Sequence, residues 1–477
     1  MTAARSPIAR FVGNATPLAI AQLGANGLLL VNTVLLARIL GVESYGLLAI
    51  GIAMYGLTAF LSDAGLGIWG MRVIDDDPDR WATVSRLTAA RSVTVWLALV
   101  LAFGAVLLLP LPEGATVPSL VMVVTMVPAG FSVEWALIGL ERTGRAAATR
   151  LVVGVAMVLF SPPLALAAGP TGAAAGYVAA AALGCGISWI LLVATIGRPR
   201  WVAPRGILPT LRRSLPMGAS AVLGQVYWQS DSLLTGILLG SVAAGLYAAP
   251  MRLLAAVVGL GWVVGTSLLP VYRALHAAGP TGVSRLATMT TRLLVLACLP
   301  AVGAAIGGAT TIVTTVLGAD FARSAPVLAV GSMTVAGWVC MVPTGYAILA
   351  RRHDHRYLAA VAAGVVTSVP LIVVVGGAWG IRGVAVAMLA AQVVAAVVIA
   401  VGAARAGVRV AMVPTVTVAV AVAVAVVAGV AAAAAPWGII GIVGVSVLAE
   451  TPFLAALALE IRRARSSVLR GGAAIVD

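Results

Sequence analysis

Long apolar runs dominate the hydropathy pattern of the chain. Fourteen runs have about the length that crosses a hydrocarbon layer, roughly 17 to 25 residues. They are 17–37, 45–64, 93–111, 117–138, 151–168, 172–195, 217–239, 243–269, 293–317, 326–349, 357–378, 383–403, 410–434 and 437–459. Membrane helices tolerate the Gly and Pro inside these runs because neighbouring helices re-satisfy the freed backbone groups. The pattern predicts an all-α integral membrane protein of about fourteen transmembrane helices.

Polar side chains interrupt two of these runs at helical spacing. In the run 217–239, the polar residues Gln225, Gln229 and Ser232 stand at i, i+4 and i+7. In the run 17–37, the polar residues Gln22, Asn26 and Thr33 have similar helical phases. We expect both faces to line a hydrated central cavity; the alternative is interhelical hydrogen bonding in a packed bundle. Trp228 lies beside the first set, where its ring could stack on a sugar or simply pack.

An offset of 199 residues superposes the first two runs on the seventh and eighth. It aligns ARILGVESYGLLA with GILLGSVAAGLYA, so that Gly41 falls on Gly240 and Gly46 on Gly245. Six runs separate the starts of the two copies, so both copies enter the membrane in the same direction. Such parallel repeats occur in transporters. The repeat predicts two six-helix lobes, 1–200 and 201–405, around a central cavity. An additional transmembrane hairpin (406–460) and a basic cytoplasmic tail (461–477) follow.

Charge is sparse, and its distribution orients the chain. Only 9% of the residues are charged, the net charge is +15, and all 30 basic residues other than His are arginines. With the N-terminus in the cytoplasm, 26 of these 30 arginines fall in internal segments. The positive-inside rule therefore predicts that both termini are cytoplasmic and that the basic balance does not serve nucleic-acid binding. The same topology leaves only short external connections, with no room for an external catalytic domain.

Ionisable groups within apolar runs are costly unless they face a cavity or a partner. Glu134, Asp231 and Arg252 lie well inside such runs, whereas Arg38 and Asp63 lie near run ends. From the matching depths of Asp231 and Arg252 we predict an ion pair that faces the cavity and takes part in transport; the alternative is that the pair is purely structural. Asp231, Glu134 and Asp63 are candidates for coupling or charge balance. Asp79 is expected to cap a helix that begins at Arg80.

Signatures of catalysis and of metal binding are missing from the sequence. No nucleophile–base arrangement, phosphate loop or zinc pattern is present, and the three cysteines each fall in a separate run without paired spacing. His353-Asp354-His355 lies in a basic loop, where neighbouring arginines oppose a bound cation. We therefore expect a protein that is not an enzyme and has no cofactor; a coupling ion, H⁺ or Na⁺, is left open.

Four segments resemble the polysaccharide transporters, which include the O-antigen-type flippases of lipid-linked oligosaccharides, within the multidrug/oligosaccharidyl-lipid/polysaccharide exporter superfamily. They are ARILGVESYGLLAI (37–50), LSDAGLGIWGMR (61–72), WALIGLER (135–142) and YAILARRHDHRYL (346–358). The resemblance covers most of 1–405. It implies two six-helix bundles around a cavity that opens alternately to each side of the membrane.

The resemblance also implies a substrate and its partners. The expected activity is transfer of a polyprenyl-diphosphate-linked oligosaccharide from the cytoplasmic to the outer leaflet of the plasma membrane, in contact with membrane lipids, with glycosyltransferases of the same pathway as candidate partners. The expected substrate-binding residues are Arg38, Arg72, Asn26, Gln225, Trp228, Gln229 and Arg252. Alternatives are an ion-coupled multidrug exporter, a cell-wall lipid flippase, and, with less support, a membrane glycosyltransferase or polymerase.

Overall fold

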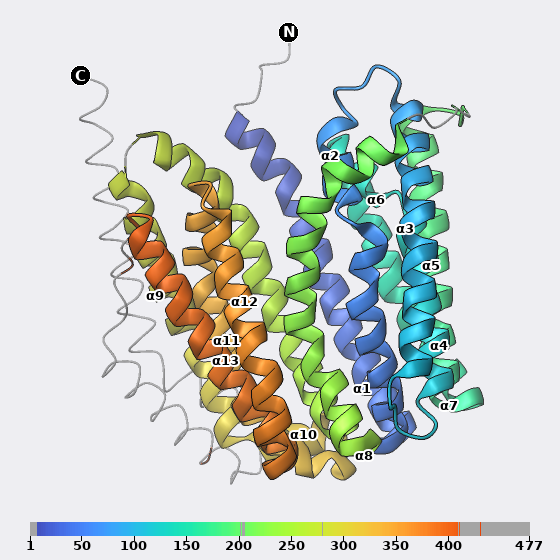
Figure 1. Cartoon of the computed structure of the whole chain (residues 1–477), viewed down its shortest axis with the longest axis vertical. Helices are drawn as coiled ribbons and strands as arrows, with labels where there is room; N and C mark the ends of the chain where they lie inside the picture. The colour runs from blue at the N-terminus through green and yellow to red at the C-terminus, as the bar shows by residue number, and fades with distance from the viewer. Residues whose placement is uncertain are drawn as a thin grey trace. The chain divides into compact units, whose positions relative to one another are not determined.

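The computed structural model describes residues 7–200, 202, 206–278, 280–408, 410 and 430. These residues are helical, without a β-strand among them, as predicted. The helices of the first half are α1 (Pro7–Asp63), α2 (Leu66–Val73), α3 (Arg80–Leu108), α4 (Thr116–Val124), α5 (Met126–Phe131), α6 (Glu134–Gly139) and α7 (Thr143–Ile196). They are followed by α8 (Ile207–Ala278), α9 (Pro280–Gly307), α10 (Ala309–Val316), the 3-10 helix η1 (Ala319–Ser324), α11 (Ala325–Ala350), α12 (Asp354–Leu371), the π-helix η2 (Ile372–Gly376) and α13 (Gly377–Arg405). Figure 1 shows their course.

Eight helical stretches in the described residues are long and apolar enough to cross a membrane. Four helices contain a non-helical kink, at Gly41 in α1, Ala168–Gly169 in α7, Gly240 in α8 and Gly380 in α13. Each kink falls where the sequence predicts a short turn between two spans, and in Figure 1 α1 returns toward the end at which it starts. The chain is a multi-pass membrane protein. The count of fourteen spans stays a prediction, since 410–434 and 437–459 lie almost wholly outside the described residues.

The chain divides into two compact units. The first comprises residues 1–263 with 361–391, and the second comprises 264–360 with 392–477. In the first, buried side chains of α2, α3 and α6, including Leu66, Leu87 and Trp135, form one core cluster. In the second, Tyr272, Val283 and Ile348 belong to another cluster. The lobe boundaries at 200 and 405 stay a prediction.

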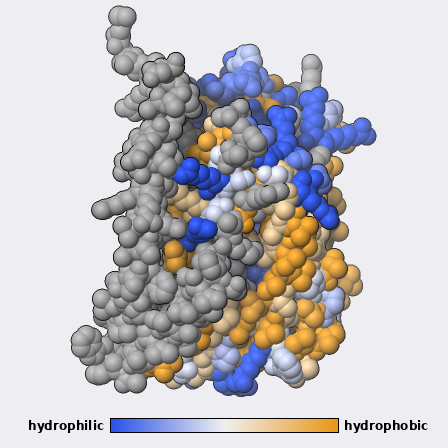
Figure 2. Space-filling model, turned by 90° about the vertical axis from the view of Figure 1, so that its left-hand side faces the viewer, coloured by the Kyte–Doolittle hydropathy of each residue, from blue (hydrophilic) through white to orange (hydrophobic). Residues whose placement is uncertain are grey.

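Polar and apolar residues are partly separated on one face of the molecule. On the face shown in Figure 2, hydrophilic residues gather toward the upper end, a smaller hydrophilic group lies at the lower end, and hydrophobic residues cover much of the coloured surface between them. Exposed large apolar side chains are numerous; Leu108 is 86% and Val100 is 68% exposed. Such side chains are stable facing lipid, because the hydrophobic cost of exposure arises only in water.

Local sequence signals explain several helix ends. Asp79 accepts a hydrogen bond from the backbone N–H of Ala82 (3.2 Å), so the predicted cap of the helix that begins at Arg80 is confirmed. Ala64 and Gly65, at φ of 46° and 77°, separate α1 from α2. Ser132 has an extended backbone and separates α5 from α6. These interruptions leave α2 and α6 as two short helices.

The kinks of α1 and α8 are equivalent under the predicted repeat. Gly41 has φ 71° and ψ 179°, and Gly240 has φ 87° and ψ 179°. The chain segments after them meet reciprocally: a Cβ on Gly46 would lie 1.8 Å from the carbonyl oxygen of Ser241, and one on Gly245 would lie 2.0 Å from that of Val42. The contact therefore requires glycine at both positions.

Substitution of these glycines should be costly. Gly46→Ala and Gly245→Ala each force backbone apart, and we expect each to lower the free energy of unfolding by about 1 to 3 kcal/mol, as overpacking does. The matched control is Gly27→Ala in the same helix as Gly46, since a Cβ there meets nothing within 4 Å. It should be neutral or slightly stabilising. Denaturant unfolding in detergent measures all three, and equal effects at Gly46 and Gly27 would contradict the close contact.

Candidate functional site

A cavity of about 650 Å³ opens in the first unit. Its wall combines side chains of α1 to α8, among them the aromatic residues Tyr55, Phe60, Trp135 and Tyr177. A volume of this size falls in the range of roughly 300 to 1,000 Å³ that ligand pockets occupy. Four charged side chains line it: Arg91, Arg150, Arg252 and Glu134. The cavity wall therefore carries an excess of positive charge.

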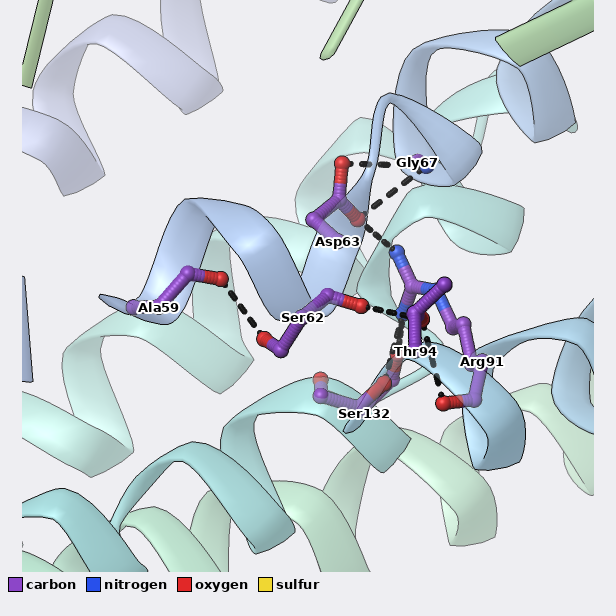
Figure 3. A network of polar contacts seen from close by, with 8 residues as sticks. Ala59, Ser62, Asp63, Gly67, Arg91, Thr94 and Ser132 are labelled. Atoms are coloured by element: carbon purple, nitrogen blue, oxygen red, sulfur yellow. Dashed lines mark hydrogen bonds and ion pairs between the residues drawn. The ribbon is translucent and has the colours of Figure 1, made fainter. Parts of the chain in front are cut away.

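Arg91, on α3, is the most heavily engaged of the three arginines (Figure 3). One Nη atom lies 2.5 Å from the carboxylate of Asp63. The other Nη atom donates to the carbonyl oxygens of Gly130 (3.0 Å) and Ser132 (2.8 Å). The guanidinium carbon also lies 5.8 Å from the centre of the Trp135 ring. Arg91 thus holds the end of α1 and the break between α5 and α6 together.

The carboxylate of Asp63 has a second role at the start of α2. It accepts the backbone N–H of Gly67 at 3.1 and 3.3 Å, which satisfies one of the free N–H groups at that helix end. Beside it, the Thr94 hydroxyl donates to the carbonyl oxygen of Ser62 (2.6 Å). Asp63 thus caps the start of α2, and its ion pair to Arg91 adds a tie to α3. Its predicted role in coupling or charge balance stays a prediction.

Arg150, on α7, anchors a second polar network. Its Nε donates to a carboxylate oxygen of Glu134 (2.6 Å), and an Nη donates to the side-chain oxygen of Gln22 (2.6 Å). Gln22 in turn donates to the side-chain oxygen of Asn26 (3.0 Å). The network links α1, α6 and α7 at the cavity. Glu134, a predicted coupling residue, is neutralised in this structure by Arg150.

Arg252, on α8, differs from the other two arginines. In the described part of the chain it makes no ion pair. Its Nε is also buried without a hydrogen-bond partner there, a property that it shares with the Nε of Arg91. Arg91 and Arg150 are each matched by a carboxylate. Arg252 therefore supplies the surplus positive charge of the cavity wall.

The predicted ion pair between Asp231 and Arg252 is wrong. Asp231 is 4% exposed and accepts hydrogen bonds from the hydroxyl of Tyr247 (2.9 Å) and the backbone N–H of Ser232 (2.6 Å). No ion pair joins the two residues, both of which the structure describes. A hydroxyl on the returning half of α8 satisfies the buried carboxylate without the cost of desolvating a guanidinium. Arg252 stays available to the cavity.

The other predicted site residues divide into two groups. Gln225 and Gln229 line the cavity, so this part of the predicted polar face meets it. Arg38 and Arg72 are exposed and do not belong to its wall, and neither do Asn26 and Trp228. Trp228 instead lies edge-on to Tyr227, with 6.0 Å between ring centres. A role for these four residues in substrate binding stays a prediction.

Arg91 and Arg150 are the cavity residues that sequence reasoning missed. The positive-inside rule treats both as cytoplasmic loop charges. The signal for Arg91 is the helical spacing of Trp81, Val84 and Leu87, which are all buried and which continue the apolar face of α3 back to its cap. That spacing places residue 91 one turn further along the same face. For metals, the described residues contain no cluster of three or more His, Cys, Asp or Glu side chains.

Comparisons with known proteins agree on family and fold. A family model described as "Polysaccharide biosynthesis protein" matches residues 11–276. Curated proteins give no match. The structure "Lipid II flippase MurJ, inward closed conformation" matches with a TM-score of 0.73 at 11% identity, over 93% of this chain and 99% of that one.

Two multidrug transporter structures match less closely. The MATE multidrug transporter DinF-BH has a TM-score of 0.59 at 14% identity, over 84% of this chain and 96% of that one. A mutant of the Vibrio cholerae MATE transporter VcmN has a TM-score of 0.57 at 15% identity, over 83% and 96% of the two chains. At these identities the likeness is one of fold.

Proposed function

Since this chain belongs to the polysaccharide biosynthesis protein family, we propose that it is a flippase that moves a polyprenyl-diphosphate-linked oligosaccharide from the cytoplasmic to the outer leaflet of the plasma membrane. The fold it shares with a flippase and with multidrug transporters supports transport as the activity. Membrane lipids surround it, and glycosyltransferases of the same pathway are proposed partners.

One observation carries the choice of substrate: Arg252 leaves a surplus positive charge in the cavity wall. Guanidinium groups bind phosphate oxygens through paired, charge-assisted hydrogen bonds. Gln225 and Gln229, on the same helix, offer amide donors and acceptors suited to sugar hydroxyls. The diphosphate and the first sugars would occupy the cavity, while the polyprenyl tail stays in the bilayer.

The mechanism we propose is alternating access. The cavity would open to the cytoplasm to admit the head group and then to the outside to release it. Both termini would be cytoplasmic, as the distribution of arginines predicts. Interfaces that exist in two discrete arrangements carry such motions. The reciprocal contact of Gly46 and Gly245 is a candidate for one such interface.

An ion-coupled multidrug exporter is the closest alternative. A cavity that binds organic cations would present an unpaired carboxylate. Glu134 is the carboxylate of the cavity wall, and it is paired with Arg150. The cavity's charge therefore favours an anionic substrate.

Transport by the purified protein in vesicles distinguishes the two functions. Vesicles that contain the protein should transfer a fluorescent polyprenyl-diphosphate oligosaccharide between leaflets and should not move a cationic dye. Protein-free vesicles give the background. Dye transport without lipid transfer would favour the exporter.

A further inference from the structure

The short helices α2 and α6 pack against each other so closely that glycine is required on both. A Cβ on Gly70 of α2 would lie 2.4 Å from the Trp135 ring of α6, and one on Gly139 of α6 would lie 2.9 Å from the carbonyl oxygen of Met71. Figure 1 shows both helices toward the same end of the first unit. Such close contact makes the two helices one packed element, which we call the α2–α6 element.

An interruption of the helical backbone precedes each of the two helices of this element. Residues 64–65 precede α2 and residues 132–133 precede α6. Arg91 spans both, through the carboxylate of Asp63 on one side and the carbonyl oxygens of Gly130 and Ser132 on the other. Non-helical positions beside helix ends are where hinges absorb backbone rotation. The two breaks and their shared anchor therefore give the α2–α6 element a common hinge.

The element also forms part of the cavity wall. Met71 of α2 and Glu134, Trp135 and Ile138 of α6 all line the cavity. Glu134 lies in the first turn of α6, beside the hinge, and its ion pair with Arg150 ties the element to α7. Both partners are partly accessible, at 30% for the Arg150 side chain and 23% for that of Glu134. An anion in the cavity can therefore reach this pair.

We propose that the Glu134–Arg150 ion pair is a latch that the substrate's diphosphate opens, so that anion binding releases the α2–α6 element to move about its hinge. This inference rests on the proposed function, since it assumes a phosphate-bearing substrate in the cavity. A diphosphate carries more negative charge than one carboxylate and can bind a guanidinium through two oxygens at once. It displaces Glu134 from Arg150, so that α6 loses this ion pair to α7.

The latch couples the free energy of anion binding to motion of the α2–α6 element. A ligand shifts a conformational equilibrium only by its differential affinity for the two states. Here the phosphate binds Arg150 in the released state and competes with Glu134 in the latched state. A neutral ligand leaves the latch closed.

Hydrogen exchange of residues 132–141 and 64–74 in lipid nanodiscs tests the proposal. In the ligand-free protein, Glu134→Gln should raise exchange in both segments by about two- to fivefold, the range that corresponds to the loss of a partly exposed ion pair. Arg150→Gln should do the same and serves as the second variant should Glu134→Gln fold poorly. Adding polyprenyl diphosphate to the wild-type protein should raise exchange similarly, and it should have no further effect in the variants.

The matched control is Arg145→Gln on the same helix. Arg145 donates to Thr195 and to the carbonyl oxygen of Leu191, both in α7, and does not line the cavity. In Arg145→Gln, hydrogen exchange at 132–141 and 64–74 should equal that of the wild-type protein, with and without polyprenyl diphosphate. Unchanged exchange in ligand-free Glu134→Gln and Arg150→Gln would overturn the latch, as would wild-type protein that binds the probe with no change at 132–141. Wild-type protein that fails to bind the probe would instead count against the proposed function, while the ligand-free comparison still decides the latch.

Discussion

Replacing Arg252 by glutamine should reduce transfer of a polyprenyl-diphosphate oligosaccharide by roughly 10- to 100-fold. The substitution removes a hydrogen bond to a charged group, which is worth about 1.5 to 3 kcal/mol. Each loss of about 1.4 kcal/mol corresponds to a factor of ten. Arg252 should contribute its full hydrogen-bond energy to substrate binding, because it has no ion pair within the described residues that the substrate would first have to break. The measurement is the initial rate of lipid transfer in vesicles at equal amounts of inserted protein.

Two further variants define what Arg252 supplies. Arg252→Lys keeps the charge but loses the paired donors, so it should fall between the wild type and Arg252→Gln. Arg382→Gln removes an exposed arginine that is absent from the cavity wall and should transfer lipid at the wild-type rate. Equal losses in Arg252→Gln and Arg382→Gln would mean that overall charge, and not the cavity, sets the rate.

Replacing Arg91 by methionine should lower the free energy of unfolding by about 3 kcal/mol. The loss of one partner from a buried ion pair typically costs about 3 to 5 kcal/mol, and the lower figure applies because the Asp63 side chain is 36% exposed. The substitution also leaves the carbonyl oxygens of Gly130 and Ser132 without this donor. The midpoint of reversible denaturation in mixed detergent micelles measures the change.

Arg86→Met is the control for Arg91. It lies on the same helix and pairs with Asp77 at 3.7 Å, with its side chain 34% exposed. Ion pairs of this kind contribute roughly 0 to 1 kcal/mol. A loss at Arg91 no larger than that at Arg86 would contradict the anchoring role that the geometry gives it.

The all-helical fold was predictable because hydropathy and turn residues are local signals. The turns expected near residues 41, 169, 240 and 380 coincide with kinks at glycine. The internal repeat could be detected only in part from the sequence. Gly172 and Gly383 make matching close approaches, to the carbonyl oxygens of Leu164 and Val375, at an offset of 211 and not 199 residues. A single offset misses this second pair, because the two copies differ in length.

The cavity was harder to predict because its chemistry depends on partners far apart in the sequence. Gln225 and Gln229 were found through their spacing on one helix. The ion pairs of Arg91 with Asp63 and of Arg150 with Glu134 join different helices. Depth arguments placed Asp231 and Arg252 at the same level but could not reveal that Tyr247 satisfies the carboxylate. Which side chain turns toward which is set by packing.

The most direct test of the proposed function is transfer by the purified wild-type protein in vesicles of a fluorescent polyprenyl-diphosphate oligosaccharide, compared with the same lipid carrying a neutral linkage in place of the diphosphate. Protein-dependent transfer of the diphosphate lipid should be well above that of the neutral lipid, because Arg252 has an anion to bind only in the first case. Equal transfer of both lipids, or no transfer above that of protein-free vesicles, would contradict the proposed function.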